Sequence, residues 1–65
     1  MKIYVNGQIT ETTSQTLYEL IIELDFDLEC IATAIDGEFV SKTKYQETLL
    51  KVNQKIEVLS PMQGG

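Results

Sequence analysis

The chain has 65 residues, enough for one domain with a small core, and its hydrophobic (43%) and charged (23%) fractions are those of a globular protein rather than a disordered one. Ten acidic residues against five lysines and no arginine give a net charge of −5. This balance argues against nucleic-acid binding, which needs clustered cations. It permits a partner with a basic docking surface, although it also serves simply to keep a small domain in solution.

Several kinds of site are excluded by residues that the chain lacks. Without histidine there is no ordinary near-neutral acid–base group, and one cysteine forms neither an internal disulfide nor a zinc cluster. The opening residues, MKIYVNG, have the pattern of neither a signal peptide nor a membrane span. We therefore expect a cytoplasmic protein without a bound metal or cofactor.

The chain opens with a predicted hairpin. Residues 2–5 form a strand, and Asn6-Gly7 predicts a type I′ turn because both residue types tolerate positive φ. The second strand is residues 8–13. The two-residue turn sets four opposite pairs: Val5–Gln8, Tyr4–Ile9, Ile3–Thr10 and Lys2–Glu11. Ile3 and Val5 then share one face of the sheet, and Tyr4 and Ile9 share the other.

A helix is predicted over residues 16–25. One apolar face follows from the helical spacing of Leu17, Leu20, Ile21 and Leu24. Thr16 followed by Glu19 fits a capping box, with Ser14 as an alternative cap, and Ile22 falls at the edge of the face. Phe26 and Leu28 are expected to close the core beyond the helix.

Four carboxylates cluster around the end of this helix, at Glu23, Asp25, Asp27 and Glu29. Calcium loops use such oxygens, but the spacing and the glycine of an EF-hand are absent. A solvated helix end followed by a loop is the favoured interpretation.

The second half predicts two further strand regions. Residues 30–35 (CIATAI) indicate a strand that is apolar on both faces, and Asp36-Gly37 predicts a second tight turn into residues 38–40. The last strand covers residues 55–59, after a turn at Asn53-Gln54. Its alternation directs Ile56 and Val58 inward and Leu59 outward, and Pro61 ends it.

A short helical turn lies between these strands. Thr43 is predicted to cap it, and Tyr45 with Leu49 or Leu50 is predicted to reach the core. The element order is ββαββ, a short helix, then β. One amphipathic helix needs a sheet to cover, so the last strand is expected beside the first and parallel to it. This is an α+β fold of the β-grasp, or ubiquitin-like, type, with a mixed sheet of about five strands. The predicted division is one domain over residues 1–60 and a flexible tail over 61–65.

The C-terminal stretch resembles that of a known family. The matching segments are IYVNG at 3–7, TLYEL at 16–20, ATAIDGEFV at 32–40 and KIEVLSPMQGG at 55–65. Together they cover essentially the whole chain, which resembles the ThiS family of small sulfur carriers in thiamine biosynthesis. The Asn53-Gln54 turn departs from the Gly-Asp type common in such carriers.

The resemblance implies a carrier rather than an enzyme. The carboxylate of Gly65, next to Gly64, would be adenylated by a ThiF-like, E1-type enzyme that uses ATP and magnesium. Sulfur from a donor such as a cysteine desulfurase would convert it to a thiocarboxylate, and a ThiG-like thiazole synthase would receive that sulfur. Glycine suits a narrow active site because it has no Cβ. The six residues after Leu59 span at most ~20 Å.

Partner contacts are predicted on the open face of the sheet. Tyr4, Ile9 and Leu59 form a candidate apolar patch near the tail, and Met62 is either a tail contact with an enzyme groove or folded back on the body. Cys30 is a rival sulfur site, but its acidic neighbours disfavour a thiolate, so it is interpreted as a strand residue. The alternative functions are a carrier for another cofactor, of the molybdopterin type, and a non-reactive β-grasp binding module.

Overall fold

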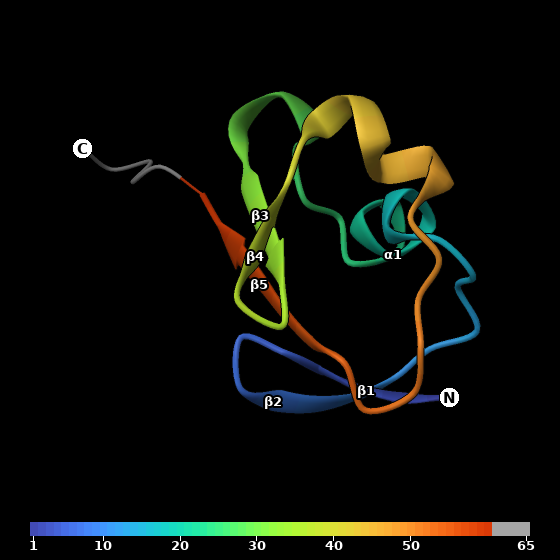
Figure 1. Cartoon of the computed structure of the whole chain (residues 1–65). Helices are drawn as coiled ribbons and strands as arrows, with labels where there is room; N and C mark the ends of the chain where they lie inside the picture. Colours follow the sequence, from blue (N-terminus) through green and yellow to red (C-terminus); the bar gives the residue numbers. More distant parts are fainter. Residues whose placement is uncertain (61–65) are drawn as a thin grey trace.

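The computed structural model describes residues 1–60 (Figure 1). Its elements follow the predicted order, with one additional 3-10 turn before the third strand. They are β1 (Lys2–Val5), β2 (Gln8–Glu11), α1 (Leu17–Glu23), η1 (Leu28–Cys30), β3 (Ala32–Ile35), β4 (Glu38–Val40), η2 (Lys42–Glu47) and β5 (Lys55–Leu59).

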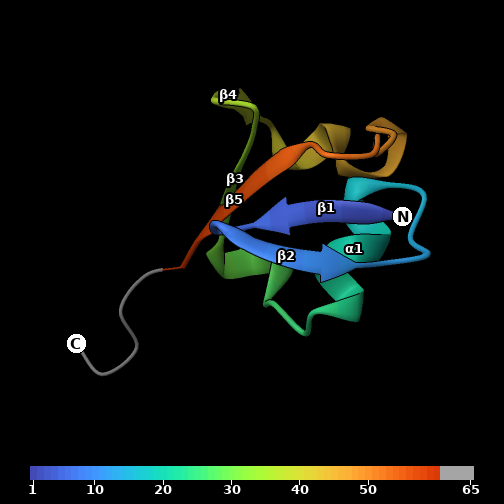
Figure 2. The same cartoon turned by 90° about the horizontal axis from the view of Figure 1, so that it is seen from below.

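The strands form one five-stranded sheet in the order β2-β1-β5-β3-β4. β5 is parallel to β1 and antiparallel to β3, while each hairpin is antiparallel. Helix α1 covers one face of the sheet (Figure 2). The predicted mixed β-grasp sheet, with its last strand beside its first, is therefore confirmed.

Both hairpins turn on two residues with positive φ. Asn6 and Gly7 have φ of 51° and 83°, and Asp36 and Gly37 have 50° and 86°. These are the angles of a type I′ turn, whose twist matches that of the flanking strands. All four predicted pairs of the first hairpin are present. β2 ends at Glu11, two residues earlier than predicted.

Helix α1 is shorter than predicted because both ends are closed by specific bonds. At the start, Thr16 Oγ1 accepts a 3.1 Å hydrogen bond from Glu19 N–H. Glu19 Oε1 in turn accepts a 2.7 Å bond from Gln15 N–H, one residue before the position expected in a capping box. At the end, Asp25 takes a φ of 65°, and Phe26 N–H bonds to Ile21 O at 3.1 Å. This Schellman-type ending turns Phe26 back onto the helix.

The core lies between α1 and the covered face of the sheet. Among residues 1–60, nine buried hydrophobic residues form it: Ile3, Val5, Leu17, Leu20, Ile21, Tyr45, Leu50, Ile56 and Val58. Phe26 and Leu28 pack against them, as predicted. Ile22 is half exposed, at the edge of the helix face. A buried 2.5 Å hydrogen bond between Thr33 Oγ1 and the Tyr45 hydroxyl joins β3 to η2 within the core.

The prediction that Cys30 belongs to a strand is wrong. Cys30 ends the 3-10 turn η1 and is exposed. Asp27 causes this turn, because its carboxylate accepts from Glu29 N–H and its carbonyl accepts from Cys30 N–H, both at 3.0 Å. β3 therefore begins only at Ala32.

The prediction that Thr43 caps the short helix is also wrong. η2 begins at Lys42, directly after its N-cap Ser41, so Thr43 lies within the helix. Of the two leucines offered for the core, Leu50 is buried and Leu49 is exposed. The segment runs extended beside the start of α1, where Leu50 N–H bonds to Gln15 O, and its alternation sends only Leu50 inward.

Candidate functional site

The root of the predicted tail is the end of β5, a central strand of the sheet. β5 leads from the end of the molecule that holds the N-terminus to the opposite edge (Figure 1). Leu59 is the last residue of β5, and Ser60 is the last residue described. Met62, Gly64 and Gly65, and with them Pro61, lie outside the described residues. The described part of the candidate site therefore ends at Ser60.

Side chains from both hairpin turns hold the main chain of β5. Asp36 Oδ1 accepts a 3.0 Å hydrogen bond from Lys55 N–H at the start of the strand. Near the other end, Asn6 Oδ1 accepts from Val58 N–H at 2.8 Å, and Asn6 Nδ2 donates to Val58 O at 3.2 Å. From the sequence, Asn6 and Asp36 are predicted only as turn residues. Local patterns carry no signal for a bond between residues 52 positions apart.

Of the predicted docking residues, Tyr4, Ile9 and Leu59 lie on the open face of the sheet, but they do not form one patch. Tyr4 pairs with Ile9 across the hairpin, and the Lys2 ammonium lies 5.3 Å from the centre of the Tyr4 ring. On the other side, Tyr4 pairs with Lys55. Leu59 lies four residues further along β5, about 13 Å away at roughly 3.3 Å per residue. Tyr4 and Ile9 are therefore remote from the tail root.

A second apolar group, most of it outside the predicted partner contacts, surrounds Leu59. Ala32 pairs with Leu59, and Ala34 pairs with both Glu57 and Phe39. The two large side chains are mostly exposed, Phe39 by 73% and Leu59 by 69%. We call the set Ala32, Ala34, Phe39 and Leu59 the tail-root patch.

The tail-root patch is hollowed and carries one acid. A depression of about 90 Å³ lies between Phe39 and Leu59, with Glu57 among its lining residues. The two-residue turn at Asp36-Gly37 is enough to predict from the sequence that Phe39 lies opposite Ala34. Leu59 comes close to Phe39 and Ala34 only because β3 pairs with β5, and this pairing is a long-range contact.

Cys30 lies in an acidic environment on the surface. Hydrogen bonding to the Asp27 side chain raises the pKa of the Cys30 thiol, and the nearby Asp27 and Glu29 charges raise it further. Lys42 acts in the opposite direction but is the smallest contribution. Because the thiolate is the nucleophilic form of cysteine, this environment disfavours sulfur chemistry at Cys30.

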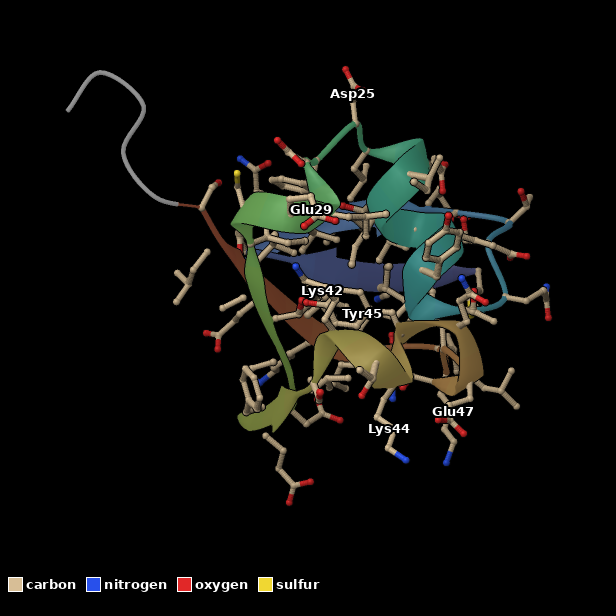
Figure 3. The ribbon with its side chains drawn as sticks, turned by 90° about the horizontal axis from the view of Figure 1, so that it is seen from above. Asp25, Glu29, Lys42, Lys44, Tyr45 and Glu47 are labelled. Atoms are coloured by element: carbon tan, nitrogen blue, oxygen red, sulfur yellow. The ribbon has the colours of Figure 1, made fainter. Side chains whose placement is uncertain are left out.

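The four clustered carboxylates have different surroundings. Glu23 Oε1 accepts hydrogen bonds from Thr12 Oγ1 at 2.5 Å and Ser14 Oγ at 2.8 Å, and the pKa of Glu23 is lowered by these bonds. Asp27 caps η1. Glu29 forms a 3.6 Å ion pair with Lys42, and the two face each other between η1 and η2, whereas Asp25 points away from the protein (Figure 3). The cluster thus occupies a helix end and a loop, as interpreted.

The Glu29–Lys42 pair lies beside a hollow of about 480 Å³, whose walls include Tyr18, Leu28 and Tyr45. Within residues 1–60, no three histidine, cysteine or acidic side chains are grouped closely enough to hold a metal ion. Across the same residues, every helix is too short or too polar to cross a membrane.

Comparisons with known proteins identify a family. The crystal structure of a thiamine biosynthesis protein (ThiS) from Geobacter metallireducens has a TM-score of 0.84 and 25% identity, with 100% of both chains covered. An NMR solution structure of a thiamine biosynthesis protein from Geobacter metallireducens has a TM-score of 0.83 and 25% identity, with 100% of this chain and 88% of that chain covered. No curated protein matches the chain. The ThiS family model matches residues 3–65, and the chain therefore belongs to the ThiS family.

Proposed function

We propose that this protein is a sulfur carrier of thiamine biosynthesis, a protein cosubstrate whose reactive group is the C-terminal carboxylate of Gly65. The observation that carries the proposal is the extent of the family match. It runs to residue 65 and so includes Gly64 and Gly65 with the strand that leads to them. The same match favours the thiamine pathway over a molybdopterin-type carrier and over a non-reactive β-grasp module.

The proposed chemistry starts at a carboxylate oxygen of Gly65. A carboxylate is a poor acyl donor, because its leaving group would be oxide. The oxygen therefore attacks the α-phosphorus of ATP, a new P–O bond forms, and the bond to pyrophosphate breaks. Sulfide then attacks the carbonyl carbon, and AMP leaves with the former carboxylate oxygen. The product is a thiocarboxylate, which a ThiG-like thiazole synthase consumes.

The carrier itself contributes presentation rather than catalysis. ATP and magnesium belong to the ThiF-like adenylating enzyme, and sulfide equivalents come from a donor system such as a cysteine desulfurase. These supplies are cytoplasmic, so the role implies a cytoplasmic location. The reacting atoms must be aligned inside the enzyme, since positioning provides much of such catalysis. Glycine at 64 and 65 lets the main chain approach closely because it has no Cβ.

Gly65 is favoured over Cys30 on electrostatic grounds. The Asp27 side chain raises the pKa of the Cys30 thiol, which leaves less of the thiolate that persulfide formation needs. A terminal carboxylate needs no deprotonation at neutral pH. The sulfur is therefore proposed to travel on the main-chain terminus.

The tail-root patch is proposed as the surface that docks on the adenylating enzyme. Phe39 and Leu59 are exposed apolar side chains next to the point where the tail leaves the sheet. Glu57 beside them, together with the net charge of −5, suits an enzyme surface that is apolar with a basic rim. Met62 is proposed to extend this contact along the tail. Tyr4 and Ile9, at the other end of the open face, are proposed to contact the thiazole synthase instead.

The test combines the purified full chain, the cognate adenylating enzyme, Mg-ATP and sodium sulfide, and measures the intact mass of the carrier. We expect one oxygen to be replaced by sulfur, with fragmentation placing the change at Gly65 and no change when ATP is omitted. Sulfur mapped to Cys30, or an unmodified carrier, would contradict the proposal. The product is then offered to thiazole synthase and to molybdopterin synthase, and only the first should consume it.

A further inference from the structure

The two sides of β5 are supported unequally at its C-terminal end. On one side β3 pairs with β5 from Ile56 through Leu59. On the other side β1 pairs only with Lys55 and Ile56, because the chain turns away at Asn6. On the side of β1, the main chain at Val58 therefore lies beyond the end of the neighbouring strand.

Asn6 fills this gap. Its main-chain N–H donates to Ile56 O at 2.8 Å, which continues the ladder by one bond. Its side-chain amide then accepts from Val58 N–H and donates to Val58 O, as a further strand residue would. Both groups on this edge of Val58 are satisfied, although β1 has ended.

Only asparagine meets both demands of this position. The turn requires a φ of 51°, which glycine, asparagine and aspartate tolerate. The contact with Val58 requires a donor and an acceptor on the same side chain, and of these three residues only asparagine has both. Glycine would make the turn without the contact, and the carboxylate of aspartate would accept from Val58 N–H but repel Val58 O.

We propose that Asn6 is a positioning residue for sulfur loading, an inference that rests on the proposed function. By holding Val58, Asn6 fixes the point at which the sheet ends and the tail begins. It also keeps the next residue, Leu59, in the tail-root patch. If this end of β5 separates from the sheet, the docking side chain is lost and the distance from the body to Gly65 changes.

The test uses a pair of matched variants. Asn6→Gly keeps the positive-φ turn and removes the contact next to the tail root. Asp36→Gly makes the same kind of change at the same turn position of the other hairpin, where φ is 50° and the contact is with Lys55, at the far end of β5. Amide hydrogen exchange of Val58 and Lys55 is measured by NMR for each variant. KM and kcat for the carrier are measured in sulfide- and ATP-dependent loading by the adenylating enzyme.

We expect Asn6→Gly to speed exchange at Val58 and to raise KM by up to roughly tenfold, the limit set by the loss of about one net hydrogen bond, with kcat unchanged. Asp36→Gly should speed exchange at Lys55 and leave KM unchanged. For Asn6→Asp, both the exchange rate at Val58 and KM should lie between those of the wild type and of Asn6→Gly. Equal KM values for the two glycine variants, or a fall in kcat alone, would overturn the inference. Failure of the proposed function is distinct, because the wild-type carrier itself would then not be loaded.

Discussion

Phe39 and Leu59 lie on the same face of the sheet, on either side of β3, and each pairs with one of its two alanines. Ala34 is opposite Phe39, and Ala32 is opposite Leu59. Small side chains between two large ones leave a depression that another protein's side chain can enter, which is the usual form of an interface centre. The relationship connects a residue in the middle of the sequence with the root of the tail.

Replacing Phe39 or Leu59 with serine should weaken docking on the adenylating enzyme. We expect KM for the carrier to rise on the order of tenfold, the effect of about 1.4 kcal/mol of lost binding free energy. Stability should change little, because both side chains are mostly exposed. Steady-state loading assays and urea unfolding measure the two effects.

Ile9→Ser is the control for this prediction. Ile9 is 66% exposed on β2, at the opposite edge of the sheet, so it offers the same chemistry in another place. A rise in KM for Ile9→Ser with none for Phe39→Ser would move the docking surface to the Tyr4–Ile9 end.

Deleting Gly65 and removing the thiol of Cys30 should have different effects on sulfur loading. Deletion of Gly65 is expected to abolish thiocarboxylate formation, because the remaining terminus lies one residue short of the reacting phosphorus, about 3.5 Å of main chain. Cys30→Ser should be loaded at the wild-type rate. Intact mass spectrometry over a time course distinguishes the two. A Cys30→Ser carrier that fails to gain sulfur would show that the thiol takes part.

Glu23 should make stability depend on acidity. Hydrogen bonds from Thr12 and, less strongly, Ser14 lower the folded-state pKa of Glu23 below its usual value of 4.5. The stabilisation is fully present above pH 4.5 and is lost as the pH falls through the folded-state pKa, because the unfolded chain takes up the proton first.

Glu23→Gln retains an acceptor oxygen but does not titrate. We therefore expect the wild type to unfold at a higher urea concentration than Glu23→Gln at neutral pH, and this difference to shrink on acidification below 4.5. A difference that stays constant with pH would mean that Glu23 stabilises the fold without its charge.

The hydrogen bond between Thr33 and Tyr45 should act as a coupled pair. Both residues are almost fully buried, with exposures of 1% and 2%. Tyr45→Phe leaves the Thr33 hydroxyl unpaired in the core, which costs about 1–3 kcal/mol of unfolding free energy. Thr33→Val does the same to the Tyr45 hydroxyl. The double variant leaves neither group unpaired and should cost less than the sum of the single variants. Strict additivity in urea unfolding would count against the coupling.

The parts of the fold that were predictable from the sequence have strong local causes. The Asn6-Gly7 turn sets its own register, and Thr16 with Glu19 marks the start of the helix, because these signals act over a few residues. The apolar run that begins at Cys30 predicts a strand from that residue onward, whereas the turn capped by Asp27 delays β3 to Ala32. The pairings of β5 with β3 and with β1 join distant parts of the chain, so local patterns show neither that Phe39 lies near Leu59 nor that Leu59 lies far from Tyr4 and Ile9.

The place of β5 in the strand order has a consequence for folding. β1 and β2 lie on one side of β5, and β3 and β4 lie on the other, so within residues 1–60 the two hairpins join the sheet only through the last strand. The two hairpins form one sheet only when β5 pairs with both of them. The Asn6–Val58 contact joins residues that are 52 positions apart in the sequence. Such non-local pairing slows folding. It also makes assembly cooperative, so β5 joins the sheet in the same step in which the core forms.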